Sequence, residues 1–210
     1  MNIISHRGYW KSEEEKNKKI SFDRSFKLGF GTETDIRDYM GKLVISHDIA
    51  DETCMCIDEF FKIYNDNSNL DLMLALNIKS DGLQVKLKEK LLKYGIKKYF
   101  VFDMSIPDTI GYLKNNLITF SRQSEYEEIP AFVNECQGIW LDAFNSTWYD
   151  SKMLSNHINN GKNVAIVSPE LHKRNHLELW EFLKNNKFDQ SYNIILCTDL
   201  PEEAIEFFNI

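Results

Sequence analysis

The sequence predicts an α/β fold with parallel strands, and three observations lead to that prediction. Short runs of β-branched and aromatic residues alternate along the chain with segments of helical periodicity. Strand, helix and strand repeated in this order favour parallel pairing. No proline-rich linker or low-complexity tract interrupts the series. Eight such units within 210 residues fit a (β/α)8 TIM barrel better than an open sheet, near the lower size limit of that fold. We therefore expect one domain spanning residues 1–210.

The individual elements follow from the same two patterns. Strands are expected where apolar, β-branched or aromatic residues form short runs, with Thr32–Ile36 and Leu43–Ser46 counted as one unit: Asn2–Ser5, Thr32–Ile36 with Leu43–Ser46, Leu72–Leu76, Tyr99–Phe102, Leu117–Phe120, Gly138–Leu141, Asn163–Val167 and Asn193–Cys197. Helices are expected where apolar residues recur at helical spacing, at Lys19–Leu28, Ile57–Tyr64, Leu83–Tyr94, Asp108–Lys114, Tyr149–Asn159, Leu177–Asn185 and Glu202–Phe208. Each of the four prolines falls near a predicted loop or helix start, where a missing N–H is tolerated.

Composition limits the classes of partner and compartment. The formal charge of −7 argues against nucleic acid as a partner, although a local positive site for one phosphate is compatible with it. No apolar stretch approaches the length of about 18 residues that a membrane span needs. The first residues lack the features of a signal peptide. The four cysteines, at positions 54, 56, 136 and 197, lack zinc-site spacing, so we expect free thiols in a reducing cytoplasm.

Four ionisable residues in the first quarter of the chain favour a functional site. His6 and His47 each follow a predicted strand, while Glu33 and Asp35 lie two positions apart within one. Residues two apart on a strand share a face, so the two carboxylates can hold a hard divalent cation together. Two histidines can act as acid and base on opposite sides of a phosphorus or carbonyl centre. A lone histidine at a strand end is more often structural, but four such residues in three successive predicted strands favour chemistry.

These residues carry a family resemblance. The segments that resemble the amino-terminal signature of the glycerophosphodiester phosphodiesterases are His6-Arg7-Gly8, Asn17, Glu33-Thr34-Asp35 and His47-Asp48. Near the other end, Cys197-Thr198-Asp199-Leu200-Pro201 resembles the Thr-Asp-x-Pro motif of that family's last strand. The family belongs to the phosphatidylinositol phospholipase C-like phosphodiesterase superfamily of barrels. The order and spacing of the matching segments bracket nearly the whole chain, although its middle is divergent.

The resemblance implies a role for each matching residue. It implies that His6 and His47 are the acid–base pair, and that Arg7 and Lys79 bind the phosphate. It also implies one divalent cation, Mg²⁺ or Ca²⁺, with Glu33 and Asp35 as ligands and Asn77 at the position of the third. The implied substrate is a small-molecule or saccharide phosphodiester, and the implied context is lipid metabolism.

Two departures from the family pattern affect the cation and the substrate. Asn77 stands where the family has a glutamate ligand, so the site loses one negative charge and is expected to bind a cation more weakly. Asp103 or Asp142, at later strand ends, are alternative sources of that carboxylate, and Lys79 is an alternative source of positive charge. The stretch between Asp48 and Asn77 is too short for the family's usual helical insertion, which helps to wall the pocket.

Other polar residues are predicted at strand ends, where TIM barrels carry their active sites. They are Asp103, Arg122, Asp142, Ser168, Thr198 and Asp199. The aromatic residues from Trp140 to Trp148 are compatible with a sugar-stacking rim, although such residues are more often core. His172 and His176 lack the His-Glu-x-x-His pattern of a zinc site, so we expect a rim loop and a helix start there.

The first functional hypothesis is a phosphoric diester hydrolase that cleaves a glycerophosphodiester or a related polyol or sugar phosphodiester. A second is a non-catalytic phosphate- or polyol-binding barrel, motivated by Asn77. A third is a metal-independent lyase that forms a cyclic phosphate. The sequence does not predict an oligomeric state.

Overall fold

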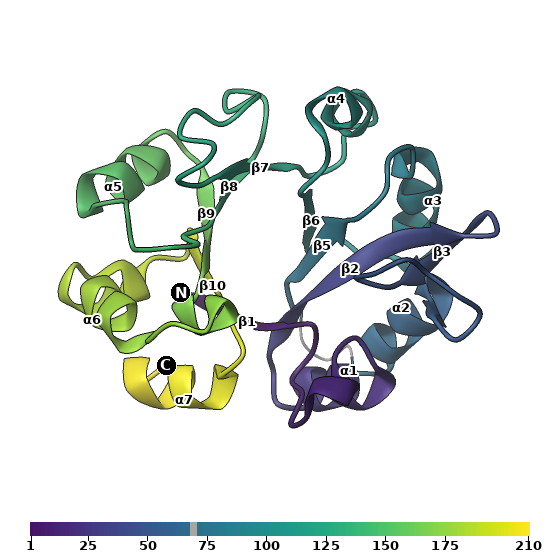
Figure 1. The fold of residues 1–210 in the computed structure, drawn as a ribbon, viewed down its shortest axis with the longest axis horizontal. Coiled ribbons are helices and arrows are strands. Elements are labelled where there is room, and N and C mark those ends of the chain that lie inside the picture. Colours follow the sequence, from purple (N-terminus) through teal and green to yellow (C-terminus); the bar gives the residue numbers. More distant parts are fainter. Residues whose placement is uncertain (68–70) are drawn as a thin grey trace. The chain divides into compact units, whose positions relative to one another are not determined.

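A computed structural model describes residues 1–67 and 71–210. The chain divides into two compact units, which are described separately. Unit 1 comprises Met1–Ile4 and Phe120–Ile210, and unit 2 comprises Ser5–Thr119. Strand β1 (Asn2–His6) runs from the first unit into the second. Figure 1 shows the elements of both.

Unit 2 is built around strand β2 (Gly31–Tyr39). β2 pairs in parallel with β5 (Leu74–Ile78), which pairs in parallel with β6 (Tyr99–Phe102). The register sets Asp35 opposite Asn77, so these two side chains leave the sheet side by side on the same face. The remaining elements are β3 (Lys42–Ile45), β4 (Met55–Cys56), the 3₁₀ turn η1 (Glu13–Glu15), α1 (Lys19–Lys27), α2 (Ile57–Asp66), α3 (Gln84–Tyr94) and α4 (Ile106–Lys114).

One strand of unit 2 departs from the parallel pattern. β3 returns antiparallel beside β2, because Met40 and Gly41 form a two-residue turn with φ values of 45° and 76°. His47 therefore does not follow a strand that runs with its neighbours, as the repeating pattern implied. The hairpin instead carries the chain back along β2, and Ser46 N–H donates to the Asp35 carbonyl at 3.0 Å.

The core of unit 2 is aromatic where α1 and α2 meet. The ring of Phe22 packs edge-on against Phe60 at 4.7 Å between centroids, and Phe26 packs against Tyr64 at 5.3 Å. All four side chains are buried. Burying a large aromatic side chain stabilises a fold by roughly 1.5–3 kcal/mol, so this cluster anchors the two helices beside the sheet.

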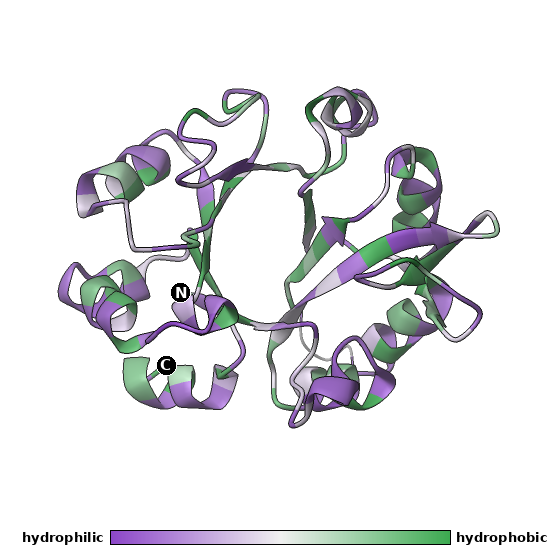
Figure 2. Cartoon of the chain, in the orientation of Figure 1, coloured by the Kyte–Doolittle hydropathy of each residue, from purple (hydrophilic) through white to green (hydrophobic). Residues whose placement is uncertain are grey.

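Unit 1 holds four parallel strands in sequence order. β7 (Phe120–Gln123), β8 (Gly138–Leu141), β9 (Asn163–Val167) and β10 (Ile194–Thr198) pair successively, and β10 neighbours β1. Gly138 is required at its position, because a Cβ there would lie 2.6 Å from the Asn163 carbonyl oxygen. The remaining elements are α5 (Ser151–Asn159), η2 (Pro169–His172), α6 (Leu177–Asn185), η3 (Phe188–Gln190) and α7 (Pro201–Phe208). Figure 2 shows hydrophobic and hydrophilic residues on α5, α6 and α7, as expected of helices with one buried face.

The expected alternation of strands and helices is confirmed, with two strands displaced along the chain. The strand expected at Leu72–Leu76 is β5, which runs from Leu74 to Ile78. The predicted strand Leu117–Phe120 is displaced, since β7 begins at Phe120, although Thr119 forms a parallel bridge with Val101 of β6. Asn116 adopts a left-handed conformation, and Leu117 N–H donates to the Tyr112 carbonyl, so these residues form the turn that ends α4. Arg122 consequently lies inside β7 and not at its end, and its side chain pairs with Glu127.

Two further expectations concern the whole chain. Within the residues that the structure describes, no helix is both long enough and apolar enough to cross a membrane. The four cysteines are free thiols, with Cys136 and Cys197 buried.

Candidate functional site

The turn after β1 positions Arg7. Arg7 and Gly8 both have positive φ values, 57° and 80°, which reverse the chain sharply after His6. A Cβ at Gly8 would lie 2.4 Å from Ser21 Oγ, so glycine is required there by the packing of α1. Arg7 N–H donates to the Glu33 carbonyl at 3.0 Å and approaches Glu33 Oε2 at 3.2 Å. These bonds fix the backbone of Arg7 against β2.

Asp35 is the centre of a cluster of charges in unit 2. Its carboxylate is fully buried and lies 3.1 Å from Arg7 Nε and 3.4 Å from Lys79 Nζ. Neither approach has hydrogen-bond geometry, but both are close ion pairs. Among the described residues, the side chain of Asp35 accepts its hydrogen bond from Asn17 Nδ2, at 2.8 Å to Oδ2. Asn17 belongs to the segments that carry the family resemblance, which gives it no role of its own, and in the structure it fixes this carboxylate.

The conformation of Asn17 explains why it can reach Asp35. Its φ is 58°, a left-handed value that asparagine tolerates better than most residues. Its backbone N–H donates to the Arg7 carbonyl at 2.9 Å, and its Oδ1 accepts from Thr34 Oγ1 at 2.8 Å. The amide is thus oriented from both sides. An asparagine just before a predicted helix was the signal in the sequence.

Glu33 is the second buried carboxylate of the cluster. Its side chain leaves β2 on the same face as Asp35, and the residue is 2% exposed. Burial, together with the neighbouring Asp35 charge, raises the pKa of Glu33 to about 8, although Arg7 and Lys79 oppose the shift. These four residues therefore interact electrostatically as one group, which we call the Asp35 cluster.

His47 and His6 are linked to the Asp35 cluster through different neighbouring residues. His47 Nδ1 lies 2.9 Å from Oδ1 of the adjacent Asp48, and the Asp48 carboxylate feels the charge of Arg7. His6 directly precedes Arg7 at the end of β1 and is partly exposed. Arg37 Nη2 donates to the His47 carbonyl at 3.3 Å, which ties the loop after β3 to β2.

The predicted ligands fit a hard divalent cation. Within residues 1–67 and 71–210, no group of three or more His, Cys, Asp or Glu residues is arranged to hold a metal. Two carboxylates and one amide nevertheless converge, because Asn77 is the register partner of Asp35. Asp35 Oδ1 and Asn77 Oδ1 are both buried, and neither accepts a hydrogen bond among the described residues. Oxygen atoms of this kind are what Mg²⁺ and Ca²⁺ take as ligands, although Arg7 and Lys79 already lie against Asp35.

The two alternative carboxylates follow strands β6 and β8. Asp103 follows β6 with a left-handed φ of 67°. Asp142 follows β8 in unit 1, where its Oδ1 accepts from the N–H of Ala143 at 2.8 Å and lies 2.7 Å from His172 Nε2. Glu170 Oε1, also in unit 1, accepts from Thr198 Oγ1 and from the Asp199 N–H. His176 pairs with Glu203, so His172 and His176 do not share a partner.

Comparison with known proteins identifies the fold. No family model and no curated protein matches the sequence. Among solved structures, the chain is similar to a glycerophosphodiester phosphodiesterase from Parabacteroides distasonis, with 16% identity and a TM-score of 0.70 over 99% of this chain and 96% of that one. It is also similar to a glycerophosphodiester phosphodiesterase from Agrobacterium tumefaciens, with 12% identity and a TM-score of 0.75 over the full length of both chains. The predicted TIM-barrel fold is confirmed, and so is the resemblance to this family at the level of fold.

The barrel alone does not identify an activity. A GH18 chitinase from Pseudoalteromonas aurantia also aligns with 99% of this chain, at 9% identity and a TM-score of 0.58. One fold therefore spans different chemistries, and any assignment must rest on the side chains.

Proposed function

We propose that the protein is a phosphodiesterase of the glycerophosphodiester type, which cleaves a glycerophosphodiester or a related polyol or sugar phosphodiester. The observation that carries this proposal is the Asp35 cluster. It holds two buried carboxylates and two cationic side chains in one place, directly after His6 and beside the loop of His47. Likeness of fold to phosphodiesterases from two bacteria supports the same chemistry.

The reaction needs a base, an acid and positive charge around the phosphoryl oxygens. His6 takes the proton from the attacking oxygen, and His47 gives a proton to the leaving alkoxide. Imidazole suits both steps because its ordinary pKa of about 6.5 makes either protonation state accessible at neutral pH. Arg7 and Lys79 stabilise the negative charge that develops on the phosphoryl oxygens, a role that is typically worth several kcal/mol.

A divalent cation belongs to the same proposal. Glu33, Asp35 and Asn77 would hold it, and when bound it would polarise a phosphoryl oxygen as a Lewis acid. Asn17 keeps Asp35 Oδ2 occupied, so Oδ1 is the atom left to serve as ligand. Because Asn77 is neutral, binding should be weaker than at a site with three carboxylates, and Asn77→Glu should tighten it by about tenfold or more.

The experiment measures hydrolysis of glycerophosphodiesters and of an aryl phosphodiester, with and without chelator. His6→Ala and His47→Ala should each lower the rate by about 10²-fold or more while leaving the urea unfolding midpoint unchanged. His176→Ala is the matched control, because that histidine pairs with Glu203 in unit 1. If both variants keep full activity on every substrate that is cleaved, the two-histidine mechanism is wrong.

The two rival functions give different outcomes in the same assays. A binding module would show calorimetric binding of phosphorylated ligands with Mg²⁺, Ca²⁺ or Mn²⁺ but no turnover. A cyclising lyase would release a cyclic phosphate and would be insensitive to chelator. The positively charged side chains of Arg7 and Lys79, which both pair with Asp35, favour this alternative.

A further inference from the structure

A cavity in unit 2, which we call the α3 cavity, lies between the β2–β3 hairpin, the beginning of α2 and helix α3. Its volume of about 500 Å³ falls within the range of small-molecule sites, roughly 300–1,000 Å³. The hairpin contributes Lys42 and Leu43 to the lining. Helix α3 contributes Lys86, Glu89 and Lys90, whose i, i+3 and i+4 spacing puts them on one face of the helix. None of the described residues that line the cavity takes part in the proposed hydrolysis.

Part of the lining of the α3 cavity is apolar. Leu43 is 2% exposed, and Cys56, the last residue of β4, is partly buried and carries a free thiol. A free cysteine behaves as a small hydrophobic side chain. These two side chains therefore provide a surface against which the carbon skeleton of a ligand can be removed from water.

Asp58, in the first turn of α2, also lines the cavity, but its charge is already balanced. Its Oδ1 accepts hydrogen bonds from Lys93 Nζ and from the Tyr94 hydroxyl, both at 2.8 Å. Its Oδ2 accepts from Lys90 Nζ and, at 3.6 Å, from the Cys56 thiol. Two ammonium groups therefore face one carboxylate, and Asp58 adds no uncompensated negative charge to the cavity.

The charge that remains at the α3 cavity is positive. Lys86 Nζ donates one of its three protons to the Gly41 carbonyl at 2.9 Å, which leaves two protons for a ligand. Lys42 adds a second, exposed ammonium group from the hairpin. Against these two, Glu89 supplies a single carboxylate. The described lining thus carries a surplus of positive charge, in a chain whose formal charge is −7.

We propose that the α3 cavity binds a small organic anion, a molecule with one anionic group on an apolar body. The anionic group accepts a hydrogen bond from Lys86 and lies close to Lys42. The apolar body packs against Leu43 and Cys56. A cationic ligand would meet the surplus ammonium groups unfavourably, and a neutral one would leave them without a counter-charge.

The first test is binding of benzoate to the full chain, measured by saturation-transfer NMR and calorimetry. Benzoate should bind with a dissociation constant of about 1–10 mM, as expected of a small ligand held by one charged group. Benzamide has the same shape without the charge, so it should bind at least about threefold more weakly. Raising the salt concentration should weaken the binding of benzoate, because salt screens exposed ammonium groups.

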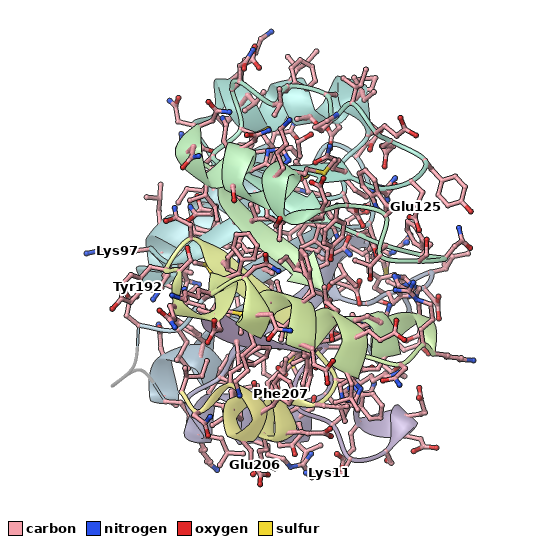
Figure 3. The ribbon with its side chains drawn as sticks, turned by 90° about the vertical axis from the view of Figure 1, so that its left-hand side faces the viewer. Lys11, Lys97, Glu125, Tyr192, Glu206 and Phe207 are labelled. Carbon is pink, nitrogen blue, oxygen red and sulfur yellow. The ribbon has the colours of Figure 1, made fainter. Side chains whose placement is uncertain are left out.

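Three variants test which charges hold the anion. Lys86→Gln removes an attractive charge, so it should weaken benzoate binding by about three- to fivefold. Glu89→Gln removes a repulsive charge and should tighten the binding by up to about threefold. Lys97→Gln is the matched control, since Lys97 is an exposed lysine of unit 2 whose side chain points outward (Figure 3). It should bind benzoate as the parent chain does.

Alkylation of Cys56 tests the place of binding without changing any charge. In a Cys54→Ser chain, Cys56 is the remaining partly exposed thiol, because Cys136 and Cys197 are buried. A benzoate ring that packs against Cys56 shields its Sγ. The rate at which iodoacetamide alkylates Cys56, followed by mass spectrometry, should therefore fall as benzoate saturates the chain.

Each outcome decides the proposal. Weaker binding to Lys86→Gln together with slower alkylation of Cys56 supports it. If either effect is missing, or if the chain binds no benzoate, the proposal is overturned. Equal affinity for benzamide and benzoate also overturns it, since the cavity would then select an apolar ring and not an anion. None of these measurements records hydrolysis, so failure of the proposed function would leave them unchanged.

Discussion

Each unit pairs a histidine with an aspartate, and the two pairs differ in what they can fix. In unit 2, His47 and Asp48 are neighbours in sequence, their side chains are 2.9 Å apart, and the Asp48 side chain is 92% exposed. In unit 1, His172 and Asp142 are 30 residues apart in sequence, their side chains are 2.7 Å apart, and the Asp142 side chain is 11% exposed. A carboxylate in water holds its partner weakly, whereas a buried one holds the imidazole in one tautomer and one orientation.

The buried carboxylates Asp142 and Asp35 also differ in the kind of group that pairs with them. Asp142 accepts hydrogen bonds from a backbone N–H and from His172, so one of its partners is fixed by the backbone itself. Asp35, one of the two buried carboxylates of the Asp35 cluster, pairs instead with the side chains of Arg7, Lys79 and Asn17. Side chains can be rearranged by a ligand more readily than backbone can. We therefore expect the Asp142–His172 pair to be rigid and the Asp35 cluster to rearrange when a cation binds.

The largest effect is expected from Asp35→Ala. The change leaves Arg7 and Lys79 without their common partner and leaves the Asn17 amide without its acceptor. Breaking a buried pair typically costs 3–5 kcal/mol, and because Arg7 and Lys79 are about one-fifth exposed we expect a loss of about 3 kcal/mol in the free energy of unfolding. Urea denaturation measures it. Asp38→Ala, on the exposed end of β2, is the control and should cost less than about 0.5 kcal/mol.

Asp142→Ala should have the next largest effect. It removes the acceptor of both His172 Nε2 and the Ala143 N–H, which are partly or fully buried, so we expect a loss of about 2 kcal/mol in urea denaturation. Glu181→Ala, on the exposed face of α6, provides the baseline for unit 1. If Asp142→Ala lowers the free energy of unfolding no more than Glu181→Ala does, the buried His172–Asp142 pair stabilises the protein no more than the exposed His47–Asp48 pair.

The sequence predicted several strands and the pair of carboxylates in unit 2, but it did not predict the His172–Asp142 pair of unit 1. Continuous apolar runs placed Tyr99–Phe102, Gly138–Leu141 and Asn163–Val167 at the bounds that the structure shows. Short motifs singled out Glu33 and Asp35, because residues two apart on a strand must share a face. His172 and Asp142 come together only through the pairing of β8 with β9, a long-range contact that local patterns do not encode.

Backbone conformation explains the other failures of sequence reasoning. The turn at Met40 and Gly41 reverses β3, although its residues Tyr-Met-Gly-Lys lack the Asn-Gly or Asp-Gly pair that marks such turns. Asn17 acts on Asp35 because it takes a left-handed conformation, which the sequence suggests only as a preference.

The pH dependence of stability should separate the two units further. The pKa of Glu33 is about 8 in the folded protein and near its ordinary 4.5 when unfolded. Between these values the folded state keeps a proton that the unfolded state has lost, so the free energy of unfolding falls as pH rises from about 4.5 to about 8. The slope contributed by one such group is at most about 1.4 kcal/mol per pH unit.

Urea denaturation in the presence of chelator, repeated across this pH range, measures the slope. Glu33→Gln should make the dependence shallower, because the amide does not titrate and occupies the same space. Asp142→Asn, which changes a carboxylate of unit 1, serves as the comparison and should retain the slope due to Glu33. An equal slope in the parent chain and in Glu33→Gln would show that Glu33 is already ionised in the folded protein.

The smallest effect is expected from Asp48→Ala, although this residue contacts a proposed catalytic histidine. Its carboxylate is almost fully exposed, and its hydrogen bond to His47 lowers the pKa of Asp48. Exposed pairs contribute little, so the unfolding midpoint should not change and hydrolysis of an aryl phosphodiester should slow by less than about fivefold. His47→Ala, measured beside it, sets the scale of a full loss. If Asp48→Ala were as slow as His47→Ala, the exposed carboxylate would have to orient the imidazole during the reaction, as Asp142 does for His172, and the contrast between the two pairs would disappear.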